Sequence, residues 1–355
     1  MSYSIDRYAE RNKVMDIKLT ICIPIYNCAE FIGQALDSIL PQAMEGVEVV
    51  VYDGGSTDET PALMGSYTRQ WTNLHYHRGS ARGGIDADLV TCVAFAKGEY
   101  CWLFSGDDVM RPGAIKQALE WISKGYDIFI CKHTICNKTM VVSHELPVLH
   151  PDLVFTANLA NSNERHEWFR HAMTTEAFFS FISGLVVRRE KWQSGELPEA
   201  FCKSCWGHVA RFLGLVNSGL TVCYVAEVWL DQRGDNDSFA DKGVVNRFRI
   251  GIEGYHKLAD SFFGHESMEA FHIRRVLRNE FSLLMLLNAK TLCVKNPEKE
   301  SKQALNDLVR MIYCDNLRAL IIKKWIYFAA PYWLIVAARF AYQPIEQIRR
   351  AQRNG

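Results

Sequence analysis

The chain has 355 residues, of which 48% are hydrophobic and 23% charged, and its 40 Lys and Arg residues balance 40 Asp and Glu residues. This composition excludes a largely disordered, collagen-like or coiled-coil protein. The zero net charge disfavours nucleic acid as a partner. Residues 1–13 lack an apolar signal-peptide core, and many of the eleven cysteines sit in apolar runs, so we expect a cytoplasmic protein with free thiols.

The first 130 residues alternate between short apolar runs and segments with helical spacing. The pattern predicts strands at residues 19–25, 47–52, 74–77 and 100–104, and helices at 31–40, 57–70, 85–96 and from Pro112 onward. Strands that alternate with helices are typical of an α/β fold with a mostly parallel, Rossmann-like sheet covered on both faces.

After residue 130 the alternation is lost. A strand is predicted at 178–187, a helix at 206–215 and an extended segment at 221–230, and from residue 244 the pattern is largely helical. We therefore expect one domain over about 15–240, with a donor half (15–130) and an acceptor half (131–240), followed by a helical region over 241–355.

Polar residues follow three of the predicted strands: Asn27, Asp53 and the pair Asp107–Asp108. In open α/β sheets, ligands bind outside the carboxyl ends of the strands. The chain has neither a GxGxxG run after a strand nor a GxxxxGK[ST] run, so a phosphate cradle of loop amides is not indicated. A divalent cation, Mn²⁺ or Mg²⁺, is then expected to neutralise a bound diphosphate.

Three acidic clusters compete for this cation, at residues 86–88, 107–108 and 235–237. Acids at the first cluster stabilise a helix start without any metal, and acids at the third are common in turns. Asp107 and Asp108 directly follow an apolar strand, so we predict both as metal ligands and Asp108 also as a catalytic residue. A cap for the helix after Pro112 is the alternative.

Three runs in order carry a family resemblance: residues 20–27 (TICIPIYN), 49–58 (VVVYDGGSTD) and 98–108 (GEYCWLFSGDD). They resemble the GT-A-fold family 2 glycosyltransferases over about residues 18–125. The GID run at 84–86 and the YCW strand look most like the abequosyltransferase-type branch, which transfers 3,6-dideoxyhexoses in O-antigen synthesis. The resemblance implies a GT-A fold and a nucleotide-diphosphate sugar as donor.

By this resemblance Asp53 would hydrogen-bond the base, and Asp108 with Asp107 would hold the metal. Arg82 would take the place of a phosphate-facing arginine, and Asp86 would contact ribose or base, with a helix cap as its alternative. Arg233 would neutralise phosphate charge in a loop that closes over the diphosphate, with a plain turn as its alternative. The residues expected to line the nucleotide pocket are Pro24, Tyr26 and Asn27.

Inverting members of family 2 usually place a Glu-Asp pair at the start of an acceptor-side helix, with the Asp as general base. The corresponding stretch here, residues 202–209 (CKSCWGHV), has no acid. His208 has a suitable ordinary pKa and is the candidate base, with a core histidine as the alternative. Glu199 is the nearest upstream carboxylate, and Asp86 lies on the donor side. Cys202, Cys205 and His208 also have zinc-ligand spacing, but a structural zinc needs a fourth ligand.

Residues 325–338 are apolar and rich in Trp and Tyr, but they are too few to span a bilayer and contain Pro331. They are flanked by Lys323, Lys324 and Arg339. From Glu300 to the last residue the sequence has nine Lys and Arg residues and four acidic residues. We predict an amphipathic helix over about 318–350 on an anionic membrane surface. A core helix with a basic tail is the alternative.

Together these observations predict a metal-dependent glycosyltransferase on the inner face of the cytoplasmic membrane. It would move a sugar, with a 3,6-dideoxyhexose favoured, to a hydroxyl of a lipid-linked oligosaccharide in O-antigen or surface polysaccharide synthesis. One alternative is a non-catalytic, membrane-associated scaffold, which the absent Glu-Asp pair favours. The other is a sugar nucleotidyltransferase, which should carry a Gly- and Arg/Lys-rich loop after the first strand; Tyr26–Glu30 lacks one.

Overall fold

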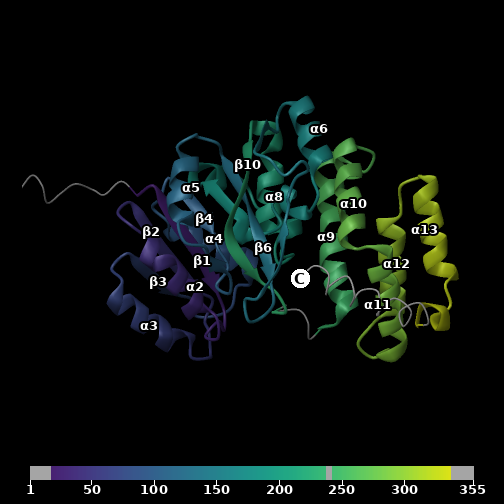
Figure 1. Cartoon of the computed structure of the whole chain (residues 1–355), viewed down its shortest axis with the longest axis horizontal. Helices are drawn as coiled ribbons and strands as arrows, with labels where there is room; N and C mark the ends of the chain where they lie inside the picture. Colours follow the sequence, from purple (N-terminus) through teal and green to yellow (C-terminus); the bar gives the residue numbers. More distant parts are fainter. Residues whose placement is uncertain (1–16, 237–241, 337–355) are drawn as a thin grey trace, which may run out of the picture. The chain divides into compact units, whose positions relative to one another are not determined.

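The computed structural model describes residues 17–236 and 242–336, and the chain divides into two compact units. Unit 1 comprises the chain up to Trp168 together with Glu176–Asp235, and it holds the sheet. Unit 2 comprises Phe169–Thr175 and the chain from Asn236 onward, and its secondary structure is helical (Figure 1).

Four strands form the parallel part of the sheet, in the order β3-β2-β1-β4. They are β1 (Leu19–Ile25), β2 (Val47–Asp53), β3 (Leu74–Arg78) and β4 (Tyr100–Leu103). All seven residues of β1 are buried, as expected for a strand that is covered on both faces. The predicted parallel pattern therefore holds for the first half of the chain, and the carboxyl ends of β1, β2 and β4 lie at one edge.

The second half of the chain extends this sheet with mixed pairing. From β4 the order continues through β9 (Leu185–Arg188), β6 (Ile128–Cys136), β10 (Thr221–Arg233) and β5 (Val109–Met110). β9 runs antiparallel to both β4 and β6, whereas β10 runs parallel to β6. Two more strands pair antiparallel at the side, β7 (Val142–Leu146) with β6 and β8 (Phe155–Asn158) with β10.

Helices with one apolar face cover the sheet. In α2 (Ile32–Ile39) the buried residues are Ile32, Ala35, Leu36 and Ile39, which is the spacing of one helical face. The other helices of the sheet region are α3 (Thr60–Gln70), α4 (Ile85–Phe95), α5 (Ala114–Ile122), α6 (Ser162–His171), α7 (Arg189–Ser194) and α8 (Gly207–Gly214).

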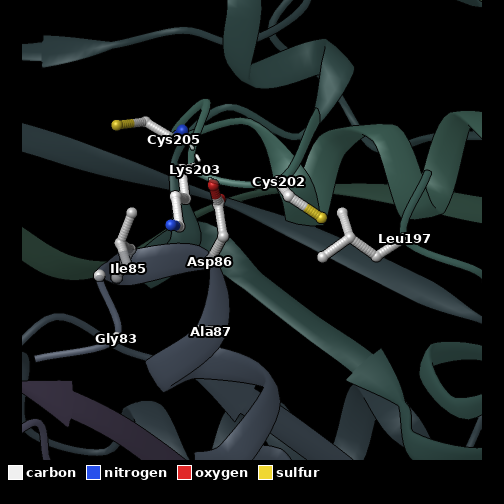
Figure 2. Close-up of a pocket in the computed structure, with 9 residues that line it drawn as sticks. Gly83, Ile85, Asp86, Ala87, Leu197, Cys202, Lys203 and Cys205 are labelled. Atoms are coloured by element: carbon white, nitrogen blue, oxygen red, sulfur yellow. Dashed lines mark hydrogen bonds between the residues drawn. The ribbon is translucent and has the colours of Figure 1, made fainter. Parts of the chain in front are cut away.

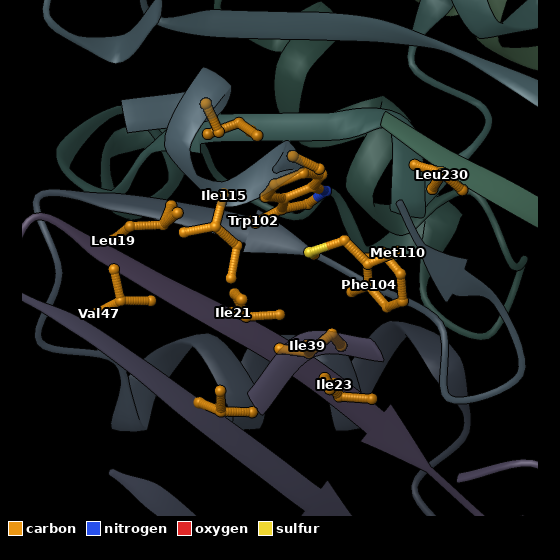
Figure 3. Close-up of a cluster of buried hydrophobic side chains, with 14 of the residues drawn as sticks. Leu19, Ile21, Ile23, Ile39, Val47, Trp102, Phe104, Met110, Ile115 and Leu230 are labelled. Carbon is orange, nitrogen blue, oxygen red and sulfur yellow. The ribbon is translucent and has the colours of Figure 1, made fainter. Parts of the chain in front are cut away.

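The core of unit 1 combines aliphatic and aromatic side chains from the strands and from the helices that cover them (Figure 3). Trp102 is fully buried, packs 5.4 Å from Trp229 between ring centroids, and donates its indole N–H to the Ser183 carbonyl at 2.9 Å. This bond satisfies the polar atom that burial of an indole would otherwise leave without a partner. It also fixes the Ser183 segment against β4, just before the Asp107–Asp108 pair.

Three local predictions are wrong. Pro112 does not open a helix, because Gly113 adopts φ 84° and α5 begins at Ala114. The helix predicted at 57–70 begins only at Thr60, after Glu59. The strand predicted at 178–187 is two 3₁₀ turns, Thr175–Phe178 and Ile182–Gly184, with only β9 extended.

Unit 2 is built from α9 (Val244–Phe263), α10 (Met268–Glu280), α11 (Leu283–Lys295), α12 (Lys302–Ile312) and α13 (Arg318–Ala329). The buried Glu300 carboxylate caps α9 from a distant part of the chain, accepting the N–H groups of Val244 at 2.8 Å and Val245 at 2.9 Å. Arg274 and Arg278 bind Asp315 at 2.8 and 2.5 Å. Burial alone would raise the pKa of Asp315, but hydrogen bonds from these arginines lower it.

The helix predicted at 318–350 is interrupted. α13 ends at Ala329, Pro331 follows, and residues 332–336 form another helical turn. Residues 337–350, Arg339 among them, lie outside the described residues. Among residues 17–236 and 242–336, no helix has both the length and the apolar character needed to cross a bilayer.

Candidate active site

The loops after β1 and β2 are tied to one another through Asn27. Asn27 adopts φ 50°, its backbone N–H donates to Ser56 Oγ at 2.8 Å, and its side-chain oxygen accepts the Thr57 N–H at 2.8 Å. Asn27 itself is exposed, whereas Pro24 is buried within β1. The predicted nucleotide-pocket residues therefore differ in exposure, and Asn27 has a clear role in joining the two loops.

Asp53, at the end of β2, has no exposed surface. Its Oδ1 accepts the Ser56 N–H at 2.7 Å, its Oδ2 accepts the Tyr76 hydroxyl at 2.6 Å, and Arg78 Nε lies 3.6 Å from Oδ2. Burial and the Asp53 charge raise the pKa of Tyr76. Asp53 thus shapes the 53–57 turn, and its contact with a base stays a prediction.

Arg82 and Tyr26 meet at this edge of the sheet. The Arg82 guanidinium lies 4.4 Å above the centre of the Tyr26 ring, a cation–π contact. Arg82 is exposed and Tyr26 half-buried. The contact thus brings the loop after β3 against the loop after β1, and it presents one positive charge and one aromatic ring there.

The Asp107–Asp108 pair follows β4 as predicted. Asp108 is 2% exposed, and its carboxylate accepts the Ser183 hydroxyl at 2.6 Å and the Arg233 backbone N–H at 2.9 Å. Burial and then the charge of Asp107 raise the pKa of Asp108 to about 8, against these two hydrogen bonds. Asp107 is half-buried, and the Ser105 hydroxyl hydrogen-bonds its Oδ1.

Arg233, at the end of β10, is 7% exposed and supports this carboxylate loop. Its Nε donates to the Asp107 carbonyl at 2.7 Å, its Nη2 to Gln34 Oε1 at 2.6 Å, and its Nη1 to the Lys138 carbonyl. The predicted position of Arg233 in an open, phosphate-facing turn does not match this geometry. All three of these side-chain nitrogens donate to groups of the protein, so Arg233 could bind a phosphate only if some of these hydrogen bonds broke. Its binding to phosphate stays a prediction.

Asp107 and Asp108 are the residues that could bind a divalent cation at this site. In the described part of the chain, no three or more His, Cys, Asp or Glu side chains form a cluster suited to a metal ion. Mg²⁺ and related cations, however, often take one or two protein carboxylates and complete their shell with water and phosphate oxygens. Two adjacent carboxylates that repel one another, one of them buried, fit this kind of site.

Asp86, on the first turn of α4, does not point at the strand-end cluster. It is 7% exposed, and its Oδ2 accepts the Cys205 N–H at 3.0 Å while its Oδ1 accepts the Gly207 N–H at 2.9 Å. The structure therefore places this carboxylate beside the start of α8. Its contact with ribose or base stays a prediction.

His208, on the first turn of α8, is 6% exposed, and neither ring nitrogen has a hydrogen-bond partner among the described residues. Burial lowers the pKa of His208, and the nearby Asp86 charge acts in the opposite direction. His208 and Asp86 are thus close, a proximity that their separation in sequence did not reveal. The role of His208 as general base stays a prediction.

A cavity of about 230 Å³ lies beside Asp86 (Figure 2). The start of α4 provides one wall and the 197–205 segment the other, so both halves of the domain contribute. The lining residues are Gly83, Gly84, Ile85, Asp86, Ala87, Leu197, Cys202, Lys203 and Cys205.

Ser183, Tyr76 and Gln34 hold the predicted acids and Arg233 in place, and none of the three was predicted from the sequence. None of them lies in a motif. Ser183 in particular lies in an apolar run that gave only a strand prediction, so no signal in the sequence marked it as a partner of Asp108.

Several known proteins resemble this chain in sequence or in fold. A sequence model of glycosyl transferase family 2 matches residues 20–183. Abequosyltransferase RfbV of Salmonella typhimurium is 28% identical over 254 residues, which are 69% of this chain and 75% of that protein. Hyaluronan synthase of Pasteurella multocida is 32% identical over 261 residues, 71% of this chain, but the match spans only 24% of that protein.

Among solved structures, S. aureus TarS residues 1–349 in complex with UDP-GlcNAc superposes with a TM-score of 0.59 at 17% identity, covering 91% of this chain and 92% of that one. This likeness confirms the predicted GT-A fold. The three runs that carried the family resemblance all lie within or overlap the matched range. The protein is therefore a glycosyltransferase, and its residues 20–183 form a family 2 domain.

Proposed function

We propose that this enzyme transfers a sugar from a nucleotide-diphosphate sugar to a hydroxyl of a lipid-linked oligosaccharide during O-antigen or surface polysaccharide synthesis. A 3,6-dideoxyhexose is the favoured sugar, because a relative that matches 69% of this chain and 75% of its own length is named an abequosyltransferase. The solved neighbour TarS, which binds UDP-GlcNAc, supports a nucleotide-sugar donor through its shared fold.

One observation carries the proposal: two acids stand at the carboxyl end of β4, against the loop that follows β1. Cys28 Sγ lies 3.4 Å from the Gly106 carbonyl, so the Asn27 loop and the Asp107–Asp108 loop touch. Tyr26 follows β1 and Arg82 follows β3, and the Arg82 guanidinium lies 4.4 Å from the centre of the Tyr26 ring. Carboxylates, a cation and an aromatic ring at one edge of a parallel sheet suit a metal-bound nucleotide diphosphate.

In the reaction, an acceptor oxygen bonds to the anomeric carbon as the bond from that carbon to the diphosphate oxygen breaks. Asp107 and Asp108 would hold Mn²⁺ or Mg²⁺, which when bound supplies positive charge beside the leaving diphosphate. Arg82 adds charge of the same sign. The acceptor proton must pass to a base, for which His208 is the candidate from the sequence.

The proposal is tested by donor turnover. The purified chain is incubated with UDP-, GDP-, CDP- and dTDP-hexoses, with and without Mn²⁺, and release of the nucleoside diphosphate is measured. We expect metal-dependent release with at least one donor, a large loss in Asp107→Asn, and no loss in Glu45→Gln, an exposed acid away from the site. Release that is equal in Asp107→Asn and the control would refute the metal site, and formation of a nucleotide-sugar from a sugar phosphate would favour the nucleotidyltransferase alternative.

We further propose that α13 holds the enzyme on the inner face of the cytoplasmic membrane. Ile321, Ile322 and Trp325 on this helix are 51%, 57% and 69% exposed, and Trp333 beyond it is 68% exposed. Lys323 and Lys324 lie between these residues in sequence; Lys323 is exposed and Lys324 is half-buried. Apolar side chains interleaved with cations are typical of helices that lie in an anionic interface.

Co-sedimentation with phosphatidylglycerol vesicles tests this role. The double variant Trp325→Ala/Trp333→Ala should bind these vesicles less, because its two largest exposed aromatic side chains can no longer insert. Met44→Ala, which removes an exposed apolar side chain from unit 1, serves as the control. Equal binding of the wild type and the double variant would show that α13 is not the anchor.

A further inference from the structure

We propose that Asp86 is the general base of the transfer and that the cavity beside it receives the acceptor sugar. This inference rests on the proposed function and goes beyond it, since it assigns the acceptor subsite and the group that takes the proton. Among the described residues that line the cavity, Asp86 is the one carboxylate. Its carboxylate oxygens can therefore accept a proton from a hydroxyl that is bound in the cavity.

The position of the carboxylate is fixed by two backbone donors from the opposite wall. The N–H groups of Cys205 and Gly207 lie 3.0 and 2.9 Å from its two oxygens. Each bond uses one acceptor site and leaves further lone pairs on each oxygen. The two bonds come from the loop before α8 and from its first residue. They fix the orientation of the carboxylate relative to the cavity.

The backbone of the opposite wall, at residues 203–207, comes close to the Asp86 carboxylate. A Cβ on Gly207 would lie 2.9 Å from Asp86 Oδ1, so a larger residue would push the carboxylate away. Lys203 and Cys205 both adopt left-handed backbone conformations, with φ of 62° and 70°. Such conformations cost about 1–3 kcal/mol each in non-glycine residues and persist where the surroundings enforce them.

The cavity also adjoins the expected donor site. The start of α4 packs against the turn after β2, because a Cβ on Gly54 would lie 2.7 Å from Asp88 Oδ2. A sugar in the cavity would therefore lie beside the strand ends where the nucleotide is expected. Ile85, Ala87 and Leu197 give the cavity apolar walls, which suit the apolar face of a sugar ring, while Asp86 accepts a hydrogen bond from its hydroxyl.

His208 supplies a second observation. It is buried and directly follows Gly207, whose N–H donates to Asp86. We therefore place His208 in the support of this contact and not at the acceptor. The chemistry balances without a further reactant: the acceptor oxygen bonds to the anomeric carbon, its proton passes to Asp86, and the electron pair of the broken bond leaves with the diphosphate.

The test uses the full-length enzyme with Mn²⁺, the donor that proves active in the panel above, and methyl hexopyranosides as acceptors. Asp86→Ala should lower kcat about 100-fold or more, as expected for loss of a general base, while nucleotide-diphosphate binding measured by titration changes little. Sodium formate, a small carboxylate, should restore part of the lost rate in Asp86→Ala. Glu199→Gln, which removes an exposed carboxylate on the acceptor side outside the cavity lining, should keep the wild-type rate.

Other results overturn the assignment. A kcat within threefold of wild type, or an equal loss of nucleotide binding, would exclude the base role, and loss of activity without formate rescue would make Asp86 only a structural cap of α8. If Asp86→Ala does not fold, Asp86→Asn replaces it, and activity that persists in the folded Asn variant refutes the proposal. A wild-type enzyme that turns over no donor would instead contradict the proposed function.

Discussion

Replacing Asp108 by Ala or by Asn separates its structural role from its charge. Ala leaves the Arg233 N–H and the Ser183 hydroxyl without the acceptor that they have at 2.9 and 2.6 Å. An unsatisfied buried donor costs about 1–3 kcal/mol, so the Ala variant should lose about 2–4 kcal/mol of unfolding free energy. In Asn, the amide oxygen can accept the Arg233 N–H while the amide nitrogen donates to the Ser183 oxygen.

The Asn variant should therefore keep its stability to within about 1 kcal/mol, because burial already disfavours the charge that it removes. Thermal unfolding of wild type, Asp108→Asn and Asp108→Ala, with and without a nucleoside diphosphate and Mn²⁺, measures both effects. We expect the metal-dependent increase in melting temperature in the wild type and in neither variant. A full metal-dependent increase in a folded Asp108→Asn protein would refute the assignment of Asp108 as a ligand, and equal melting temperatures of the Ala and Asn variants would refute the hydrogen-bond reasoning.

Three further substitutions test single interactions. Asp315→Asn breaks a buried ion pair and should cost about 3 kcal/mol of unfolding free energy. The pKa of Asp315 is lowered in the folded chain, so the ion pair stabilises the fold above the ordinary pKa near 3.9, and this contribution is lost as the pH falls through the lowered value. Urea unfolding should therefore show a smaller difference between variant and wild type in acid than at pH 7. Glu300→Gln keeps one acceptor for the two N–H groups at the start of α9 and should cost about 1–2 kcal/mol, and an unchanged melting temperature would exclude the cap. Tyr76→Phe removes the hydroxyl that positions Asp53 and should raise the donor KM by about tenfold or less with kcat kept; a fall in kcat alone would argue against a binding role for Asp53.

The first half of the fold was predictable because its signals are local. β1 is a continuous apolar run that ends at polar residues, and α2 repeats its apolar residues at helical spacing. Both patterns follow from burial of one strand or one helical face. The Asp107–Asp108 pair was found for the same reason, since it directly follows the buried residues of β4.

The second half was less predictable because its elements depend on distant partners. β6 contains Lys132 and His133 within its nine residues, which interrupt the apolar pattern, and it is nevertheless enclosed between β9 and β10. The 3₁₀ turn at Ile182–Gly184 lies in an apolar stretch of sequence that is equally typical of a strand. Such segments take their structure from pairing across the sheet, and a short apolar run alone does not distinguish the outcomes.

The same dependence explains why the candidate site could be predicted only in part, and it has a consequence for the enzyme. Asp108 follows β4, but it is held by Ser183 and Arg233, which are 75 and 125 residues further along the chain. Conversely, the start of α8 is held by Asp86 on α4, across 119 and 121 residues. Each part of unit 1 thus positions a carboxylate or a backbone segment of the other. Because buried polar groups without partners are costly, we expect both loops to reach their final geometry only when the two parts have folded together.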